Sequence, residues 1–200
     1  MLRTLAPLRG AVAIVCSPNN PTGGVLPEDG ITQLLATGAT VLFDRAYGDF
    51  AEDALPPLHD NLVTFSTFSK AWGLAALRVG WLASTAATCR EIRKVKLPYS
   101  LNILSEAIAE IALERRDLRD ANVAATIAER ERVLAAMRAM PRVTVYPSAA
   151  NFIAFRSPVS FEDFLERGIL IRKYADFLRV SIGTREENDR FLSVIDGALA

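Results

Sequence analysis

Residues 64–81 read TFSTFSKAWGLAALRVGW and place Lys70 in a polar break between two apolar runs. The β-prone, apolar residues 62–68 predict a buried strand with Lys70 at its carboxyl end. In open α/β sheets ligands bind at that edge, where a desolvated lysine can act as a nucleophile toward aldehydes. Arg78 lies within the second apolar run, so we expect its guanidinium to be buried. A buried guanidinium needs an anionic partner such as a carboxylate or a phosphate. The alternative from this stretch alone is a surface lysine and an arginine in a structural ion pair.

Length and composition restrict the class of protein and of partner. The 200 residues suffice for one good-sized domain or slightly more, and 50% of them are hydrophobic. Lys plus Arg and Asp plus Glu each total 23, so no basic surplus favours a nucleic acid or an anionic membrane. No apolar run is long enough to span a bilayer, and the first residues lack the apolar core of a signal peptide. We expect a soluble, cytoplasmic protein that binds small molecules.

Cysteine and histidine usage argues against a metal centre. Cys16 and Cys89 lie in apolar runs without zinc-ligand spacing, which is typical of reduced, cytoplasmic thiols. The single histidine, His59, follows two prolines in a predicted loop. We therefore expect neither a Ser/His/Asp triad nor a multi-histidine metal site.

Two further predicted strands also end in polar residues. Residues 11–16, AVAIVC, predict a parallel strand buried on both faces, which ends in SPNNPTGG with Asn20 in the break. A second buried strand at residues 40–43 is followed directly by Asp44 and, three residues later, by Tyr47. Taken alone, SPNNPTGG is more typical of an ordinary turn. An acid at a strand end, such as Asp44, is usually a loop cap or an ion-pair partner. The spacing leaves room for a crossover connection between successive strands.

The run at residues 67–80, TFSKAWGLAALRVG, resembles the lysine signature of fold-type I pyridoxal-phosphate-dependent aminotransferases, closest to the histidinol-phosphate aminotransferase branch. The NPTG of residues 20–23 resembles a second motif of that family. The resemblance implies pyridoxal 5'-phosphate as cofactor, its aldehyde on Lys70. Its phosphate would be held by the matching hydroxyl and arginine residues, Thr67, Ser69 and Arg78.

The resemblance also implies roles for residues elsewhere in the chain. Asp44 matches the carboxylate that keeps the cofactor's ring nitrogen protonated, so that the ring accepts electrons. Asn20 and Tyr47 match the pair that shares the cofactor's 3-hydroxyl, and Asn20 also lies near the substrate carboxylate. Arg179 matches the arginine that binds the substrate α-carboxylate, and Arg172 matches a second arginine near the substrate. The chain departs from the usual pattern at three further positions, Arg45, Trp72 and Ala76.

The predicted organisation is α/β. We expect residues 1–102 to be the carboxyl-terminal part of a cofactor-binding large domain with a mainly parallel sheet. Residues 103–140, with apolar residues at helical spacing, predict a helical connector. Residues 141–200 predict a small α+β domain, with strands at 143–146, 152–155, 169–172 and 177–182 and helices near 161–166 and at the end.

The resemblance covers nearly the whole chain but only the later part of the family's sequence. We therefore expect an amino-terminally truncated or split enzyme, a remnant, or a gene model that starts late. The implied function is transamination of an amino acid or amino-alcohol phosphate with a 2-oxo acid. Partners would be a second copy, as in the family's homodimers, or a missing amino-terminal segment. Alternatives are a threonine-phosphate decarboxylase, an aromatic aminotransferase, or a non-catalytic remnant or assembly partner.

Overall fold

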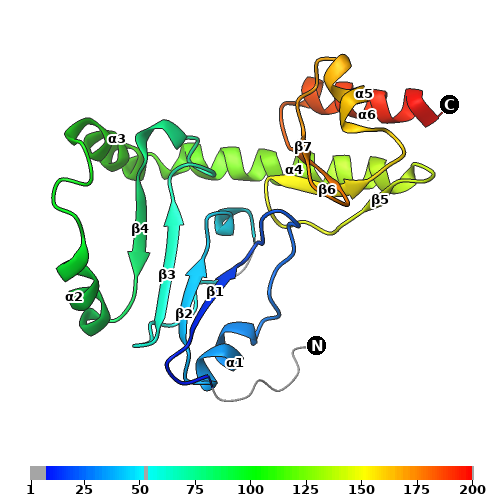
Figure 1. The fold of residues 1–200 in the computed structure, drawn as a ribbon. Coiled ribbons are helices and arrows are strands. Elements are labelled where there is room, and N and C mark those ends of the chain that lie inside the picture. Colours follow the sequence, from blue (N-terminus) through cyan, green and yellow to red (C-terminus); the bar gives the residue numbers. More distant parts are fainter. Residues whose placement is uncertain (1–7, 52–53, 200) are drawn as a thin grey trace.

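The structure is a computed structural model that describes residues 8–51 and 54–199, with side chains through Gly197. The parts of the predicted domains at residues 1–7, 52–53 and Ala200 lie outside the described residues. Two separate sheets, bridged by a long helix, form the molecule (Figure 1).

The first sheet has four strands in the order β1-β2-β3-β4. The first three strands are parallel and the fourth is antiparallel, which confirms the predicted mainly parallel sheet. Cys16 pairs with Asp44, and Asp44 pairs with Phe65, so the parallel strands end at one edge. The strands are β1 (Val12–Cys16), β2 (Thr40–Asp44), β3 (Leu62–Thr67) and β4 (Gly80–Ala83).

One face of this sheet packs against α1 (Gly30–Ala36). Ile31 and Leu34 of α1 contact Val41 and Phe43 of β2 in a small core. The prediction that β1 is buried on both faces is wrong. Val12 and Ile14 are 61% and 74% exposed, because β1 is an edge strand and no described element covers their side.

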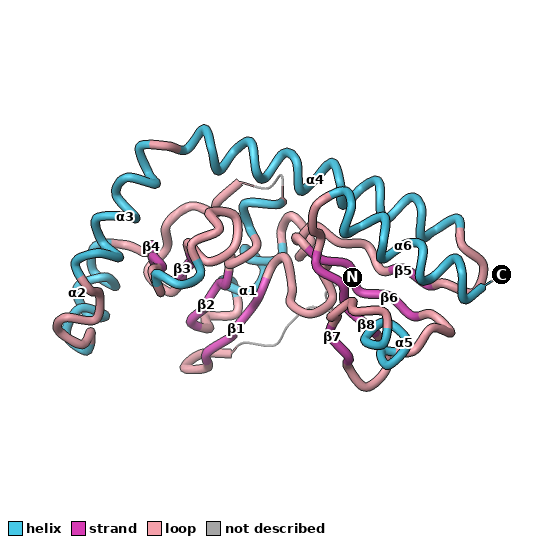
Figure 2. Tube along the Cα trace, turned by 90° about the horizontal axis from the view of Figure 1, so that it is seen from above, coloured by secondary structure: helices cyan, strands magenta, loops and turns pink. Residues whose placement is uncertain are grey.

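The connecting segments are mostly helical. A short 3-10 turn, η1 (Gly48–Phe50), follows β2, and a second, η2 (Ala75–Leu77), precedes β4. Helix α2 (Ala86–Val95) begins at the Thr85 cap, and α3 (Ile103–Glu114) begins at the Asn102 cap. The 24-residue helix α4 (Arg116–Ala139) then passes alongside both sheets, as the view from above shows (Figure 2).

The second sheet is antiparallel, with the strand order β5-β6-β8-β7. Its core contains Val133, Leu134 and Met137 from α4, Phe164 from α5 and Phe191 from α6. The sequence predicts a strand at residues 169–172. The observed strand is shorter and begins later, because hydrogen bonding to β8 starts only at Arg172. The elements are β5 (Thr144–Val145), β6 (Phe152–Arg156), α5 (Phe161–Glu166), β7 (Arg172–Lys173), β8 (Leu178–Ser181) and α6 (Arg185–Leu199).

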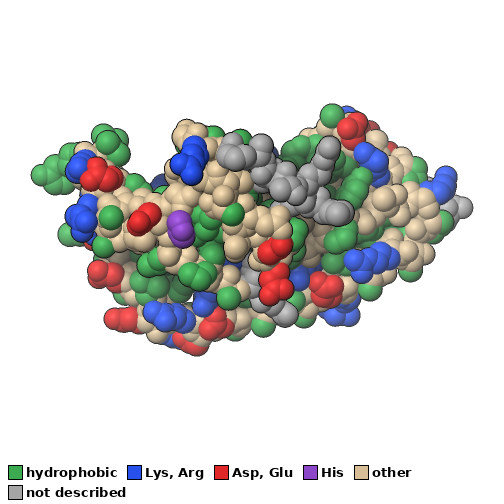
Figure 3. Space-filling view, turned by 90° about the horizontal axis from the view of Figure 1, so that it is seen from below, with side chains coloured by type: hydrophobic (Ala, Val, Ile, Leu, Met, Phe, Trp, Pro, Cys, Tyr) green, Lys and Arg blue, Asp and Glu red, His purple; other side chains and the backbone are tan. Residues whose placement is uncertain are grey.

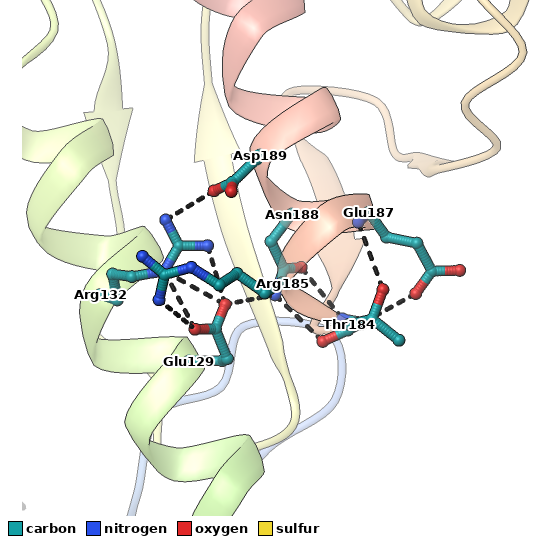
Figure 4. Close-up of polar contacts among 8 residues, drawn as sticks. Glu129, Arg132, Thr184, Arg185, Glu187, Asn188 and Asp189 are labelled. Atoms are coloured by element: carbon teal, nitrogen blue, oxygen red, sulfur yellow. Dashed lines mark hydrogen bonds and ion pairs between the residues drawn. The ribbon is translucent and has the colours of Figure 1, made fainter.

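A polar network joins α4 to α6 (Figure 4). The Glu129 carboxylate accepts hydrogen bonds from Arg132 (2.8 Å) and from the buried Asn188 amide (3.0 Å). Asn188 also bonds both the N–H and the C=O of Gly183, at 3.0 Å each. Arg132 pairs with Asp189 at 2.7 Å. The carboxyl-terminal half of α4 is therefore fixed to the second sheet's lobe.

Apolar side chains remain at the surface of the first lobe. Besides Val12 and Ile14, Trp81 and Leu82 of the other edge strand are exposed. The space-filling view from below shows green apolar side chains interspersed with charged ones across that face (Figure 3). Within the described residues, no helix has both the length and the apolar character to cross a membrane.

Candidate active site

The two lobes meet through Asn20 and Arg179, which lie 159 positions apart in the sequence. Arg179, on β8, donates from Nη1 to the Asn20 Oδ1 at 2.6 Å. The Arg179 Nε is buried and has no hydrogen-bond partner among the described residues. An arginine N–H without a partner, between two lobes, is suited to bind a carboxylate, because a carboxylate accepts two parallel hydrogen bonds from a guanidinium.

Lys70 and Arg179 are linked through two aromatic rings. The Lys70 Nζ lies 5.2 Å from the centroid of the Tyr47 ring. Tyr47, only 6% exposed, meets Phe152 edge to face with centroids 5.0 Å apart. The Arg179 guanidinium carbon lies 4.5 Å from the centroid of the Phe152 ring. The structure thus brings together the predicted amine, phenol and carboxylate-binding residues.

Asp44 ends β2 at the same edge, where its Oδ1 accepts a hydrogen bond from the Ala46 N–H at 2.8 Å. Its other carboxylate oxygen accepts no hydrogen bond from the described residues, and the residue is half-buried. Cys16 lies beside it, directly across the strand pair. Burial raises the pKa of the Cys16 thiol above its ordinary value, and the nearby Asp44 charge acts in the same direction. We expect Cys16 to remain a neutral thiol.

Thr67 and Ser69 form a hydroxyl pair beside Lys70. Their hydroxyl oxygens lie 2.8 Å apart, and the Thr67 oxygen also accepts from the Ser69 N–H at 3.0 Å. The prediction that Arg78 is buried is wrong. Arg78 is exposed, has a left-handed backbone (φ 58°), and donates to the Ala75 carbonyl at 2.8 Å. It lies in the short connection before β4 and outside the apolar interior.

Arg172 lies directly opposite Arg179 in the β7–β8 pair. Residues that face each other across an antiparallel pair place their side chains on the same side of the sheet. Two like charges in this position repel each other unless an anion lies between them. Arg172 is exposed at the edge of the sheet.

The turn that holds Asn20 rests on the second lobe. Gly23 has φ +82°, and an added Cβ there would overlap the Ser148 side chain. The Gly23 carbonyl accepts from the Ala149 N–H at 2.9 Å, and the Asn19 carbonyl accepts from the Gly23 N–H at 2.6 Å. The glycine of the NPTG motif is required both for its backbone conformation and for this close contact.

Arg45, which the sequence left without a role, is buried. Its side chain is 5% exposed and its guanidinium carbon lies 5.5 Å from the Phe43 ring centroid. A Cβ on Gly48 would lie 2.5 Å from the Arg45 Nε. Arg45 also borders a cavity of about 640 Å³ between α1 and the loop that contains Leu55. Arg45 is therefore packed against the Phe43 ring and the turn at Gly48.

Three polar residues of α4, missed at the sequence level, contact the site's loops. Arg119 pairs with Asp49 at 2.6 Å, and its guanidinium carbon lies 5.2 Å from the Trp72 ring centroid. Asn122 donates to the carbonyl of Ala71, next to Lys70, at 3.0 Å. Arg130, buried, donates to two backbone carbonyls. Alternating charges on a predicted helix do not reveal which of them face inward.

The donor set fits a pyridoxal phosphate group. An amine, a carboxylate, a phenol, an amide and two hydroxyls lie around the carboxyl ends of β1, β2 and β3, where open α/β sheets bind ligands. The unpartnered Arg179 Nε provides a further donor for an anion. Within the described residues, no cluster of histidine, cysteine and carboxylate could hold a metal ion.

Comparison with known proteins identifies the family. The family described as Aminotransferase class I and II matches residues 2–195. The chain belongs to this family. It is 37% identical over 192 residues to a histidinol-phosphate aminotransferase of Thermococcus gammatolerans, covering 92% of this chain and 55% of the relative. It is also 37% identical over 214 residues to histidinol-phosphate aminotransferase 2 of Burkholderia pseudomallei, covering 100% of this chain and 60% of that one. The chain therefore spans somewhat over half the length of these relatives.

Solved structures give the same fold. The histidinol-phosphate aminotransferase of Sinorhizobium meliloti, solved in complex with pyridoxal-5'-phosphate, is 26% identical with a TM-score of 0.81. That match covers 94% of this chain and 58% of the other. L-threonine-O-3-phosphate decarboxylase from Porphyromonas gingivalis has a TM-score of 0.83 at 22% identity, which shows a shared fold alone. The chain thus has the α/β fold of fold-type I pyridoxal-phosphate-dependent aminotransferases, which confirms the predicted fold class.

Proposed function

We propose that this chain provides the amino-transfer residues of a histidinol-phosphate aminotransferase-like enzyme that uses pyridoxal 5'-phosphate. One observation supports the proposal most directly. Lys70 lies over the Tyr47 ring, and Phe152 connects that ring to Arg179, which hydrogen bonds to Asn20. Residues from both lobes thereby converge at the carboxyl edge of the first sheet.

Each of these residues has a distinct task in holding the cofactor. Thr67 and Ser69 donate hydrogen bonds to its phosphate, and Arg78, which is exposed beside them in sequence, supplies a positive charge. Asp44 holds the proton on the ring nitrogen, and Asn20 and Tyr47 bind the ring hydroxyl. When bound, pyridoxal phosphate supplies a ring that accepts the electrons of the substrate's broken bond.

Lys70 and Arg179 act on the substrate. Lys70 would hold the cofactor's aldehyde and, once free of it, would move the proton of the substrate's α-carbon, first as general base and then as general acid. Arg179 binds the α-carboxylate through its Nε and one terminal nitrogen, in exchange for its bond to Asn20. Arg172, on the same side of the sheet, adds positive charge for an anionic substrate such as an amino-alcohol phosphate.

The active form includes a further polypeptide segment beyond these 200 residues, either in a longer chain or as a partner, and pairs as a homodimer. Two features support this proposal: among residues 8–51 and 54–199 no strand pairs with either edge of the first sheet, and apolar residues on both edges are exposed. The isolated chain is therefore expected to bind the cofactor weakly or not at all. A stable yellow sample whose cofactor borohydride fixes onto Lys70 contradicts that expectation.

A fusion protein tests the proposed function. The part of the Thermococcus gammatolerans relative outside the matched region is joined to this chain, and histidinol phosphate and 2-oxoglutarate are supplied. We expect ping-pong kinetics and a loss of turnover in Lys70→Ala, with Lys96→Ala, an exposed lysine, as the matched control. Sequential kinetics, or full turnover in Lys70→Ala, contradicts the proposal.

The same fusion separates the alternatives. Release of carbon dioxide from threonine phosphate identifies a decarboxylase, and preference for phenylalanine identifies an aromatic aminotransferase. A folded, cofactor-binding fusion with no turnover on any of these substrates identifies a non-catalytic remnant.

A further inference from the structure

Helix α4 belongs to two packing regions at once. Its carboxyl-terminal half contributes Val133, Leu134 and Met137 to the core of the second lobe. The Glu129–Asn188 and Arg132–Asp189 contacts hold that half against α6 (Figure 4). This end of α4 therefore moves with the sheet that carries Arg179.

The amino-terminal half of α4 contacts the loops that follow β2 and β3. Arg119 pairs with Asp49, and Asn122 bonds the Ala71 carbonyl. Arg119 and Arg130 are about three helical turns apart and so lie on the same side of the helix. That side faces the segments next to Tyr47 and Lys70.

Arg130 lies where these two regions meet. The residue is 7% exposed, and its Nη1 donates to the Phe50 carbonyl at 3.3 Å and to the Ala150 carbonyl at 3.2 Å. Phe50 closes the turn that begins after Tyr47, and Ala150 comes two residues before Phe152. One guanidinium nitrogen thus contacts the backbone of both lobes beside the aromatic contact of Tyr47 with Phe152.

Burying the Arg130 guanidinium costs stability, and an apolar residue at the same position would avoid that cost. Desolvating a guanidinium is unfavourable, and well-packed apolar residues often replace buried charges without loss of stability. Here the charge is offset by two carbonyls and by Glu131, whose Oε1 lies 2.9 Å from the Arg130 Nε. A planar fork with several fixed donors can satisfy separate acceptors in one geometry, which the single ammonium of lysine does less well.

We propose that Arg130 is a positioning residue that sets the separation between the Lys70–Tyr47 half and the Arg179 half of the site. It acts through the backbone at Phe50 and Ala150 and touches neither substrate nor cofactor. That these two groups of residues form one active site rests on the proposed function. The effect of Arg130 on the distance between them does not.

Distance measurement on the isolated chain tests the proposal. Spin labels are placed at Arg90 on α2 and Glu166 on α5, both exposed, after Cys16 and Cys89 are changed to serine. We expect one narrow distance distribution in the parent protein and in the control Arg138→Ala, an exposed position on the same helix. Arg130→Ala is expected to lose the narrow peak, and millimolar guanidinium chloride, but not sodium chloride, to restore it.

A parent-like distribution in folded Arg130→Ala overturns the proposal. If Arg130→Ala does not fold, Arg130→Lys decides the question. A folded Arg130→Lys protein with a broadened distribution supports positioning, and one that is unfolded or has the parent distribution overturns it. The measurement needs neither cofactor nor turnover. An inactive fusion protein therefore defeats the proposed function without affecting this result.

Discussion

At the scale of single residues, the site depends on Phe152 as much as on its charged members. The ring contacts Tyr47 on one side and the Arg179 guanidinium on another. Phe152 is itself buried in the small cluster that includes Ala71 and Ala150. An apolar residue of the second lobe thus contacts the side chains of both Tyr47 and Arg179.

Arg179→Lys is expected to weaken the binding of the 2-oxo acid in the active fusion protein. Lysine cannot form the two parallel hydrogen bonds, and the loss of charge-assisted bonding costs about 1.5–3 kcal/mol, or roughly a tenfold to hundredfold rise in KM. Steady-state kinetics measures this change, with Arg138→Lys as the matched control. An unchanged KM for the 2-oxo acid contradicts the carboxylate role of Arg179.

The sequence predicts the residues whose positions follow from strand ends. The loops of Asn20, Asp44 and Lys70 lie at one edge because their strands are parallel and in register. The exposure of Arg78 was not predictable, since it depends on a left-handed turn within an apolar run. Arg130 and Asn122 were missed for another reason. Their side chains donate to backbone carbonyls, and every residue type has a backbone carbonyl, so the sequence does not identify these partners.

At the scale of elements, the antiparallel β3–β4 pair constrains the Lys70 loop. Gly80 pairs with Thr67, and a Cβ at Gly80 would lie 2.8 Å from the Ser66 carbonyl oxygen. The backbone at this pair is therefore too close for a side chain. Val79 and Phe68, just beyond the pair, are also hydrogen bonded through their backbones at 3.0 Å.

Gly80→Ala is expected to destabilise the protein by about 1–3 kcal/mol, because the backbone must shift to accept the methyl group. Urea unfolding measures the loss. The control is Gly197→Ala on α6, where an added Cβ meets nothing within 4 Å. That variant is expected to be neutral or stabilising by at most about 1 kcal/mol. Equal midpoints for the two variants contradict the steric argument.

The elements themselves were largely predictable, and their surroundings were not. Helix α5 has the predicted bounds, and its amino-terminal end is set locally by the Ser160–Asp163 capping box. The apolar pattern of β1 gave the strand but the wrong burial. Burial depends on which other elements cover a face, and that is a property of the assembled lobe.

At the scale of the whole molecule, α4 and its ion pairs join the lobes and give stability a pH dependence. Hydrogen bonds from Arg132 and Asn188 lower the pKa of Glu129 from its ordinary 4.5 to about 2. Because the folded-state pKa is the lower one, this stabilisation is complete above about pH 4.5 and is lost as the pH falls toward 2.

Glu129→Gln is expected to flatten the stability profile in this window, because glutamine has no charge to lose. The comparison is the urea midpoint at several pH values, with Glu110→Gln, an exposed position on α3, as control. If the parent and Glu129→Gln lose stability in parallel between pH 4.5 and 2, the contribution assigned to Glu129 is wrong.

Ile14→Lys is expected to reduce self-association of the isolated chain without loss of stability. The side chain is 74% exposed on an edge strand, where lysine discourages further strand pairing. Sedimentation velocity reports the change. Thr32→Lys adds the same charge to the same lobe without removing apolar surface, so it is expected to have little effect. Equal self-association of the parent and Ile14→Lys contradicts this view of the edge.

The position of Phe152 makes it a natural reporter. A fluorinated phenylalanine at this one position would sense the ring current of the phenol and the field of the guanidinium together. Its fluorine resonance would therefore shift when a carboxylate ligand binds at Arg179 and when the Tyr47 ring moves. Neither change requires turnover.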